Sequence, residues 1–152
     1  MRLTLLRHGR ADWPAGRYTD ADRPLDAVGL REASAAGAAL ADFEPPPSLL
    51  LHSPAVRTAQ TAALVRRALG DPSLRVIADQ RLYLASAQRI CAVLDDWARE
   101  VQHVVVIGHN PGLSDLASHL PGGSGRTLST GQWASAQLWA DSRSFSASLL
   151  PR

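Results

Sequence analysis

Two nitrogen-rich side chains and a glycine follow a short apolar run near the start of the chain. The run is LTLL (3–6), and the residues behind it are Arg7, His8 and Gly9. An arginine fork suits phosphate or carboxylate oxygens, and a neutral imidazole can act as a nucleophile or a base. A solvated strand end could contain the same residues, so this stretch alone leaves both interpretations open.

Two later apolar runs are followed by similar side chains. SLLLHS (48–53) leads to Arg57, and HVVVIG (103–108) leads to His109 and Asn110. In both places a proline marks the start of an expected helix, where free amides and the helix dipole favour an anion. Taken singly, Arg57 could be a solvated helix residue, and His109 could be satisfied by the backbone.

Hydrophobic periodicity predicts strands that alternate with helices. The expected strands are 3–6, 48–53, 74–78 and 103–108, and the expected helices are 28–43, 55–69, 87–100 and a short one ending at His119. The segments 133–140 and 144–150 alternate as two further strands joined by a turn at 141–143. This pattern predicts one three-layer α/β/α domain over residues 1–152, with a mostly parallel central sheet, helices on both faces and a C-terminal β-hairpin-like pair.

The predicted sheet would bring the candidate residues together. Ligands of parallel sheets bind at the carboxyl ends of the strands. Arg7, His8, Arg57 and His109 each follow a predicted strand, so we expect them to meet at one edge. Their conjunction indicates an anion site that contains a reactive histidine.

Composition narrows the protein class. The 152 residues are 45% hydrophobic and 20% charged, which suits one globular domain without a membrane span, and we expect a cytoplasmic protein. All sixteen basic residues are arginines, but they are scattered and the net charge is only +2, which argues against nucleic acid as a partner. Cys91 is the only cysteine, which excludes an internal disulfide and a thiolate metal cage.

Three motifs of this chain resemble the hallmarks of the histidine phosphatase superfamily, which includes the phosphoglycerate mutases. They are RHG (7–9), SPAVRT (53–58) and GHN (108–110), in the order and context of that family. DRPL (22–25) and HNPG (109–112) are most similar to its small bacterial branch, which contains the SixA-like phosphohistidine phosphatases. The resemblance implies a phosphoglycerate mutase-like fold.

The resemblance also implies roles for the residues of these three motifs. His8 would be the nucleophile that becomes phosphorylated, and Arg7 and Arg57 would hold the phosphoryl oxygens. His109, in its protonated form, would add positive charge opposite the nucleophile. Gly9 would leave clearance beside it, so that backbone or substrate can come close. Neither a metal nor a cofactor is implied.

The general acid is where this chain departs from larger family members, which carry an acidic residue after the third strand. Here that region reads Leu82-Tyr83-Leu84. Asp12, Asp20 and Asp22 in the loop 10–27 are possible substitutes, and Asp12, four residues past His8, is our first candidate. Each of the three could equally cap the loop or pair with an arginine of the same loop. An alkoxide leaving group needs a proton, whereas an imidazole, with a pKa of about 6.5, needs far less help.

We therefore expect a metal-independent phosphatase that forms a phosphohistidine on His8. Its expected substrate is a protein that carries phosphohistidine. The alternative is a phosphomonoesterase for a sugar or nucleotide, which the long loop 10–27 would grip through residues such as Trp13 and Arg17. A third alternative is a phosphate- or phosphoprotein-binding module without turnover. Asn110 completes the predicted substrate-binding residues.

Overall fold

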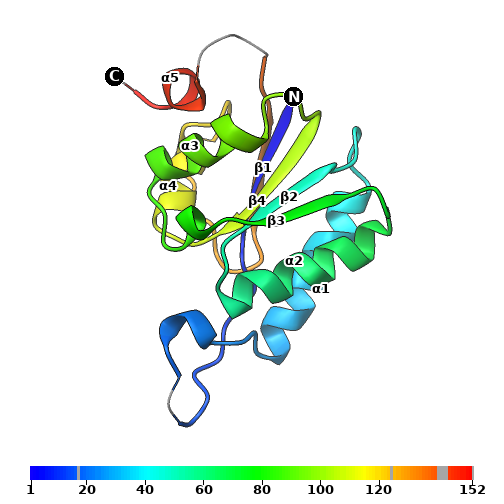
Figure 1. The fold of residues 1–152 in the computed structure, drawn as a ribbon, viewed down its shortest axis with the longest axis vertical. Coiled ribbons are helices and arrows are strands. Elements are labelled where there is room, and N and C mark those ends of the chain that lie inside the picture. Colours follow the sequence, from blue (N-terminus) through cyan, green and yellow to red (C-terminus); the bar gives the residue numbers. More distant parts are fainter. Residues whose placement is uncertain (17, 124, 140–143, 152) are drawn as a thin grey trace.

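Five strands form one sheet, and four of them run parallel (Figure 1). The strands are β1 (Arg2–Arg7), β2 (Leu49–His52), β3 (Arg75–Ala78), β4 (His103–Gly108) and β5 (Trp133–Gln137). Their order across the sheet is β3-β2-β4-β1-β5, with β5 antiparallel to β1. The structure is a computed structural model that describes residues 1–16, 18–123, 125–139 and 144–151.

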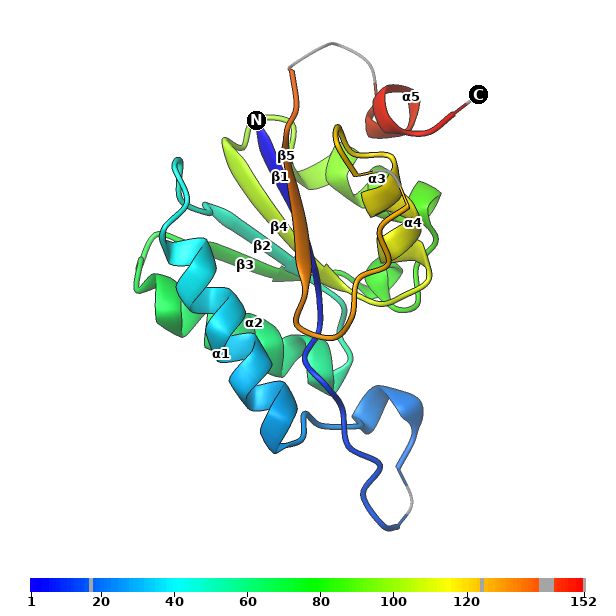
Figure 2. The ribbon, with the colours of Figure 1, turned by 180° about the vertical axis from the view of Figure 1, so that it is seen from behind.

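Helices cover both faces of the sheet, as Figures 1 and 2 show from opposite sides. One face carries α1 (Ala27–Ala41) and α2 (Val56–Leu69), and the other carries α3 (Ala87–Trp97), α4 (Gly112–Ser118) and α5 (Phe145–Leu149). Two short 3-10 helices, η1 (Asp20–Asp22) and η2 (Gln80–Leu82), lie in the connections. The predicted α/β fold with a mostly parallel sheet is confirmed. No helix within the described ranges is long and apolar enough to cross a membrane.

The central strands read as unbroken apolar runs because both of their faces are covered. Successive side chains of a strand point to opposite faces. Leu49 and Leu51 accordingly pack in the core beneath α3 and α4, whereas Leu50 packs in the core beneath α1 and α2. The same division sends Leu5 to the first core and Leu6 to the second.

The C-terminal prediction was wrong in one element. Residues 144–150 were expected to form the second strand of a hairpin, but Phe145–Leu149 is the helix α5. The hydroxyl of Ser144 accepts from the amide of Ala147, which caps the helix, and Asp95 on α3 accepts from the amide of Phe145. The apolar residues at 145 and 149 fit a helical period as well as an alternating one, and capping with packing on α3 decides between them. The predicted turn at 141–143 lies outside the described residues.

The backbone that follows β1 packs directly on the start of α1. A Cβ atom on Gly9 would meet the carbonyl group of Gly29, and one on Gly29 would meet the backbone of Arg10. Asp26 caps α1 by accepting from the Gly29 amide at 2.7 Å. The space left by Gly9 therefore admits the backbone of α1, which is the first of the two alternatives expected for it.

We expect Gly29→Ala to lower the free energy of unfolding by about 1–3 kcal/mol, because the added methyl group must push two backbones apart. Ala38→Ser, on the exposed side of α1, is the control and should change stability by less than about 0.5 kcal/mol. Chemical denaturation measures both. A Gly29→Ala protein as stable as the control would contradict the close packing.

Candidate active site

The four residues expected to meet at the sheet edge do so. Arg7 ends β1, His8 follows it, Arg57 lies in the first turn of α2, and His109 follows β4. They line a cavity of about 250 Å³ together with Arg10, Ala11, Arg23, Leu84, Asn110 and Thr130. His8, Arg57 and His109 are buried, and the two imidazole ring centres lie 5.3 Å apart.

Arg57 lies between the two histidines and contacts both. Its Nε is 3.3 Å from Nε2 of His8, and its terminal nitrogen Nη2 is 3.1 Å from Nδ1 of His109. A guanidinium group has only donors. Both ring nitrogens therefore accept from Arg57 through their lone pairs.

The backbone fixes the other nitrogen of His8. Its Nδ1 lies 2.6 Å from the carbonyl oxygen of Gly9, which can only accept, so Nδ1 carries the proton. Burial lowers the pKa of His8 to about 4, and the positive charges of Arg57 and Arg7 act in the same direction. At neutral pH His8 is an uncharged imidazole, and its unprotonated Nε2 accepts from Arg57 at the cavity.

His109 is held in the complementary tautomer. Because Nδ1 accepts from Arg57, the proton lies on Nε2, which donates to the hydroxyl oxygen of Ser53 at 2.7 Å. Burial, followed by the charge of Arg57, lowers the pKa of His109 to about 3. The expectation of a protonated His109 is therefore wrong for this arrangement, in which the ring is neutral.

Asp20 and Tyr83 complete the support of Arg57, and the sequence analysis gave neither of them this role. The backbone oxygen of Asp20 accepts from Arg57 at 2.7 Å and its carboxylate accepts at 3.0 Å. The same carboxylate accepts from the Tyr83 hydroxyl at 2.6 Å. The hydrogen bond from Tyr83, together with those from Arg57, lowers the pKa of Asp20 to about 2, so this group is ionised and holds Arg57 in place.

Arg7 and Asn110 converge on one backbone carbonyl. The oxygen of Leu128 accepts from Arg7 at 3.1 Å and from the side-chain amide of Asn110 at 2.8 Å. Ser114 donates to the amide oxygen of Asn110 at 2.6 Å, which orients that side chain. Asn110 thus lies where the sequence placed it, on the cavity wall.

Arg23 is a cavity residue to which the sequence analysis gave no role. Its guanidinium group lies over the ring of Trp13, 3.5 Å from the ring centre. Its Nε donates to the backbone oxygen of Asp12 at 3.0 Å, and its Nη1 forms an ion pair with the carboxylate of Asp20 at 3.3 Å. The loop 10–27 has no periodicity, so the sequence gave no signal that Arg23 would line the cavity or that Asp20, a candidate acid, would pair with Arg57.

Two of the predicted substrate-binding residues, Gly9 and Asp12, do not line the cavity. Asp12 is exposed, and its carboxylate accepts from the amide of Trp13 at 2.8 Å, which is the loop-capping alternative. Gly9 packs against α1, and Arg17 lies outside the described residues. Of the residues that line the cavity in the described chain, none has a carboxylate. The described residues also contain no cluster of three or more His, Cys, Asp or Glu side chains that could hold a metal ion.

This chain is similar to proteins of one known family. Residues 3–83 match the model of the histidine phosphatase superfamily (branch 1). A 2,3-bisphosphoglycerate-dependent phosphoglycerate mutase from Rhizobium meliloti (strain 1021) is 38% identical over 82 residues, which are 53% of this chain and 39% of the mutase. The chain thus spans about two fifths of the length of such curated relatives.

Two solved structures resemble the whole fold. A SixA protein from Agrobacterium tumefaciens is 28% identical, with a TM-score of 0.78 over 88% of this chain and 89% of that chain. The protein histidine phosphatase SixA complexed with tungstate is also 28% identical, with a TM-score of 0.77 over 91% of this chain and 88% of that one.

The geometry predicts that both site histidines stay neutral well below the pH at which a free imidazole titrates, about 6.5. Burial and Arg57 disfavour the charged rings, so we expect titration midpoints near 4 for His8 and near 3 for His109. Nitrogen-15 NMR of the imidazole rings measures both midpoints and the tautomers, and His8→Ala identifies the His8 signals. Two protonated rings at pH 6 would contradict this electrostatic account.

Proposed function

The chain belongs to the histidine phosphatase superfamily (branch 1), and from this premise we propose that it hydrolyses phosphorylated substrates through a covalent phosphohistidine on His8. The observation that carries the proposal is the pair of hydrogen bonds from Arg57, which leave the Nε2 lone pair of a neutral His8 at a cation-lined cavity. A neutral imidazole is a competent nucleophile once Arg57 transfers its hydrogen bond to the substrate.

In the first step Nε2 of His8 attacks the phosphorus atom, and the bond from phosphorus to the leaving group breaks. The leaving group takes that electron pair. Arg57 transfers its hydrogen bond from Nε2 to a phosphoryl oxygen, and Arg7 neutralises a second one. The ring becomes positively charged when phosphorylated, and the Gly9 carbonyl stabilises it because it accepts from Nδ1.

In the second step water attacks the phosphorus atom and the bond to Nε2 breaks. The electron pair returns to Nε2, which restores neutral His8. Both hydrogens of the water leave with the product as dihydrogen phosphate. Cations on the protein supply the charge neutralisation that phosphoryl transfer requires, so the proposal invokes no metal.

The most suitable substrate under this proposal is phosphohistidine in a protein. The cavity lining offers no carboxylic acid in the described chain to protonate an alkoxide. A phosphohistidine protonated on its second nitrogen leaves as neutral imidazole and needs no such acid. Likeness to SixA supports this choice, and we assign Asn110 and Arg23 to substrate binding.

We expect the wild-type protein to hydrolyse p-nitrophenyl phosphate equally well with and without EDTA. His8→Ala should lower kcat by at least about a thousandfold, because the covalent route is lost. His119→Ala, an exposed histidine remote from the cavity lining, is the matched control and should keep full turnover. Persistent turnover by His8→Ala would exclude His8 as the nucleophile, and loss of activity in EDTA would exclude metal independence.

A substrate panel separates the candidate functions. A phosphohistidine-bearing carrier protein should have a kcat/KM at least about tenfold above those of ribose 5-phosphate and AMP, since only its leaving group departs without an acid. A preference for the sugar phosphate or AMP would instead indicate a small-molecule phosphomonoesterase. Tight binding of phosphate, with neither turnover nor a trapped acid-labile phosphoprotein, would indicate a binding module.

A further inference from the structure

A second cavity, of about 480 Å³, lies between α2 and the β3 edge of the sheet. Its lining residues include His52, Arg66, Arg67 and the alanines at positions 59, 62 and 63. No residue is shared with the lining of the candidate active site. Its volume is within the range of small-molecule sites.

The cavity exists because small side chains of α2 face the edge strand. Ala59, Ala62 and Ala63 have the i, i+3, i+4 spacing of one helix face. Across from them, Val76 of β3 is only partly buried, and no strand extends the sheet beyond β3 in the described chain. These residues form an apolar wall on which a flat group could lie.

His52, a mostly buried residue, provides a hydrogen-bond acceptor that is accessible from this cavity. The residue is only 9% exposed, and its Nδ1 donates to the Ser53 carbonyl oxygen at 2.8 Å. A neutral ring then has its lone pair on Nε2, which has no hydrogen-bond partner among the described residues. A ligand that donates a hydroxyl or N–H to His52 would satisfy this atom.

Two arginines without a partner in the described chain line the cavity at the C-terminal end of α2. Arg66 and Arg67 lie in the last turn of α2, and neither guanidinium group makes a hydrogen bond or ion pair within the described part of the chain. Asp71 also lines the cavity, and one oxygen of its carboxylate, Oδ1, accepts from the amide and hydroxyl of Ser73 at 2.8 and 2.7 Å. The helix dipole tolerates cations here, but the pair also provides ten N–H donors for an anion.

We propose that this cavity is a second ligand site that takes a nucleotide, with phosphate on Arg66 and Arg67, a hydroxyl group donating to His52, and the base against the alanine wall. The three features require an anion, a hydrogen-bond donor and an apolar plane in one small molecule. A free phosphate has no plane, and a nucleoside has no anion, so each satisfies only part of the site.

The test is a two-dimensional amide NMR titration with AMP, on the His8→Ala protein so that the probe is not hydrolysed. We expect saturable shifts at Ala59, Ala62, Ala63 and Val76. Adenosine and inorganic phosphate, used as separate probes, should bind there at least about tenfold more weakly, since each lacks one part of the required chemistry. Shifts confined to Gly9 and Gly108, beside the other cavity, would overturn the proposal.

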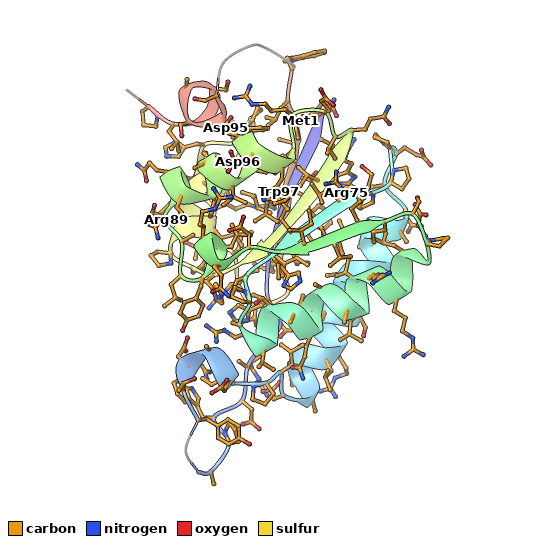
Figure 3. The ribbon with its side chains drawn as sticks, in the orientation of Figure 1. Met1, Arg75, Arg89, Asp95, Asp96 and Trp97 are labelled. Atoms are coloured by element: carbon orange, nitrogen blue, oxygen red, sulfur yellow. The ribbon has the colours of Figure 1, made fainter. Side chains whose placement is uncertain are left out.

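Variants locate the contacts. The double change Arg66→Gln and Arg67→Gln should weaken AMP binding at least about tenfold, because two charge-assisted contacts are lost. The matched control is Arg89→Gln on α3, which lies across the sheet from α2 (Figure 3), and it should bind like the parent protein. His52→Leu should weaken AMP binding but leave phosphate binding unchanged. Unchanged AMP affinity in the double variant, with a spectrum showing a folded protein, would overturn the assignment.

Discussion

One guanidinium group orders two imidazole rings in this protein. Arg57 can only donate, so His8 and His109 both turn a lone pair toward it. The remaining proton of each ring is held by an acceptor, the Gly9 carbonyl for His8 and the Ser53 hydroxyl for His109. Burial and the nearby positive charge keep both rings neutral, and this neutrality leaves a reactive nitrogen on His8 at the cavity.

The sheet order makes this arrangement possible. β2, β4 and β1 are adjacent and parallel, so the segments that follow them emerge side by side at one edge. The segment after β2 begins α2 with Arg57, the one after β4 carries His109, and the one after β1 carries His8. Asp20 reaches the same edge from η1, which lies in the loop beyond the end of β1 (Figure 1). The loop thus brings the counter-charge that holds Arg57 between the rings.

The sequence was informative where local patterns control structure. Unbroken apolar runs predicted the buried strands, and the rule for ligand sites in parallel sheets predicted that Arg7, His8, Arg57 and His109 would meet. The prediction from sequence failed where contacts between distant segments determine the local structure. Besides its local cap at Ser144, α5 depends on Asp95, which accepts from the amide of Phe145 and which no local pattern can show.

The same limit applies inside the site. Asp20 is one of several aspartates in an aperiodic loop, and nothing in its neighbours distinguishes it from Asp12, which instead caps the next amide. Gly9 was correctly singled out as a position without room for a side chain, but the backbone that needs the space belongs to Gly29, twenty positions away. The charge state of His109 depends on burial and on Arg57, which only the assembled structure reveals.

The central claim is that the protein presents Nε2 of His8 to phosphorus while Nδ1 keeps its proton. The most direct measurement is to quench the phosphorylated protein in alkali, in which phosphohistidine is retained, and to locate the phosphoryl group by phosphorus–nitrogen NMR coupling on nitrogen-15-labelled histidine. The account predicts phosphorus on Nε2 of His8. Phosphorus on Nδ1, or on another residue, would contradict it.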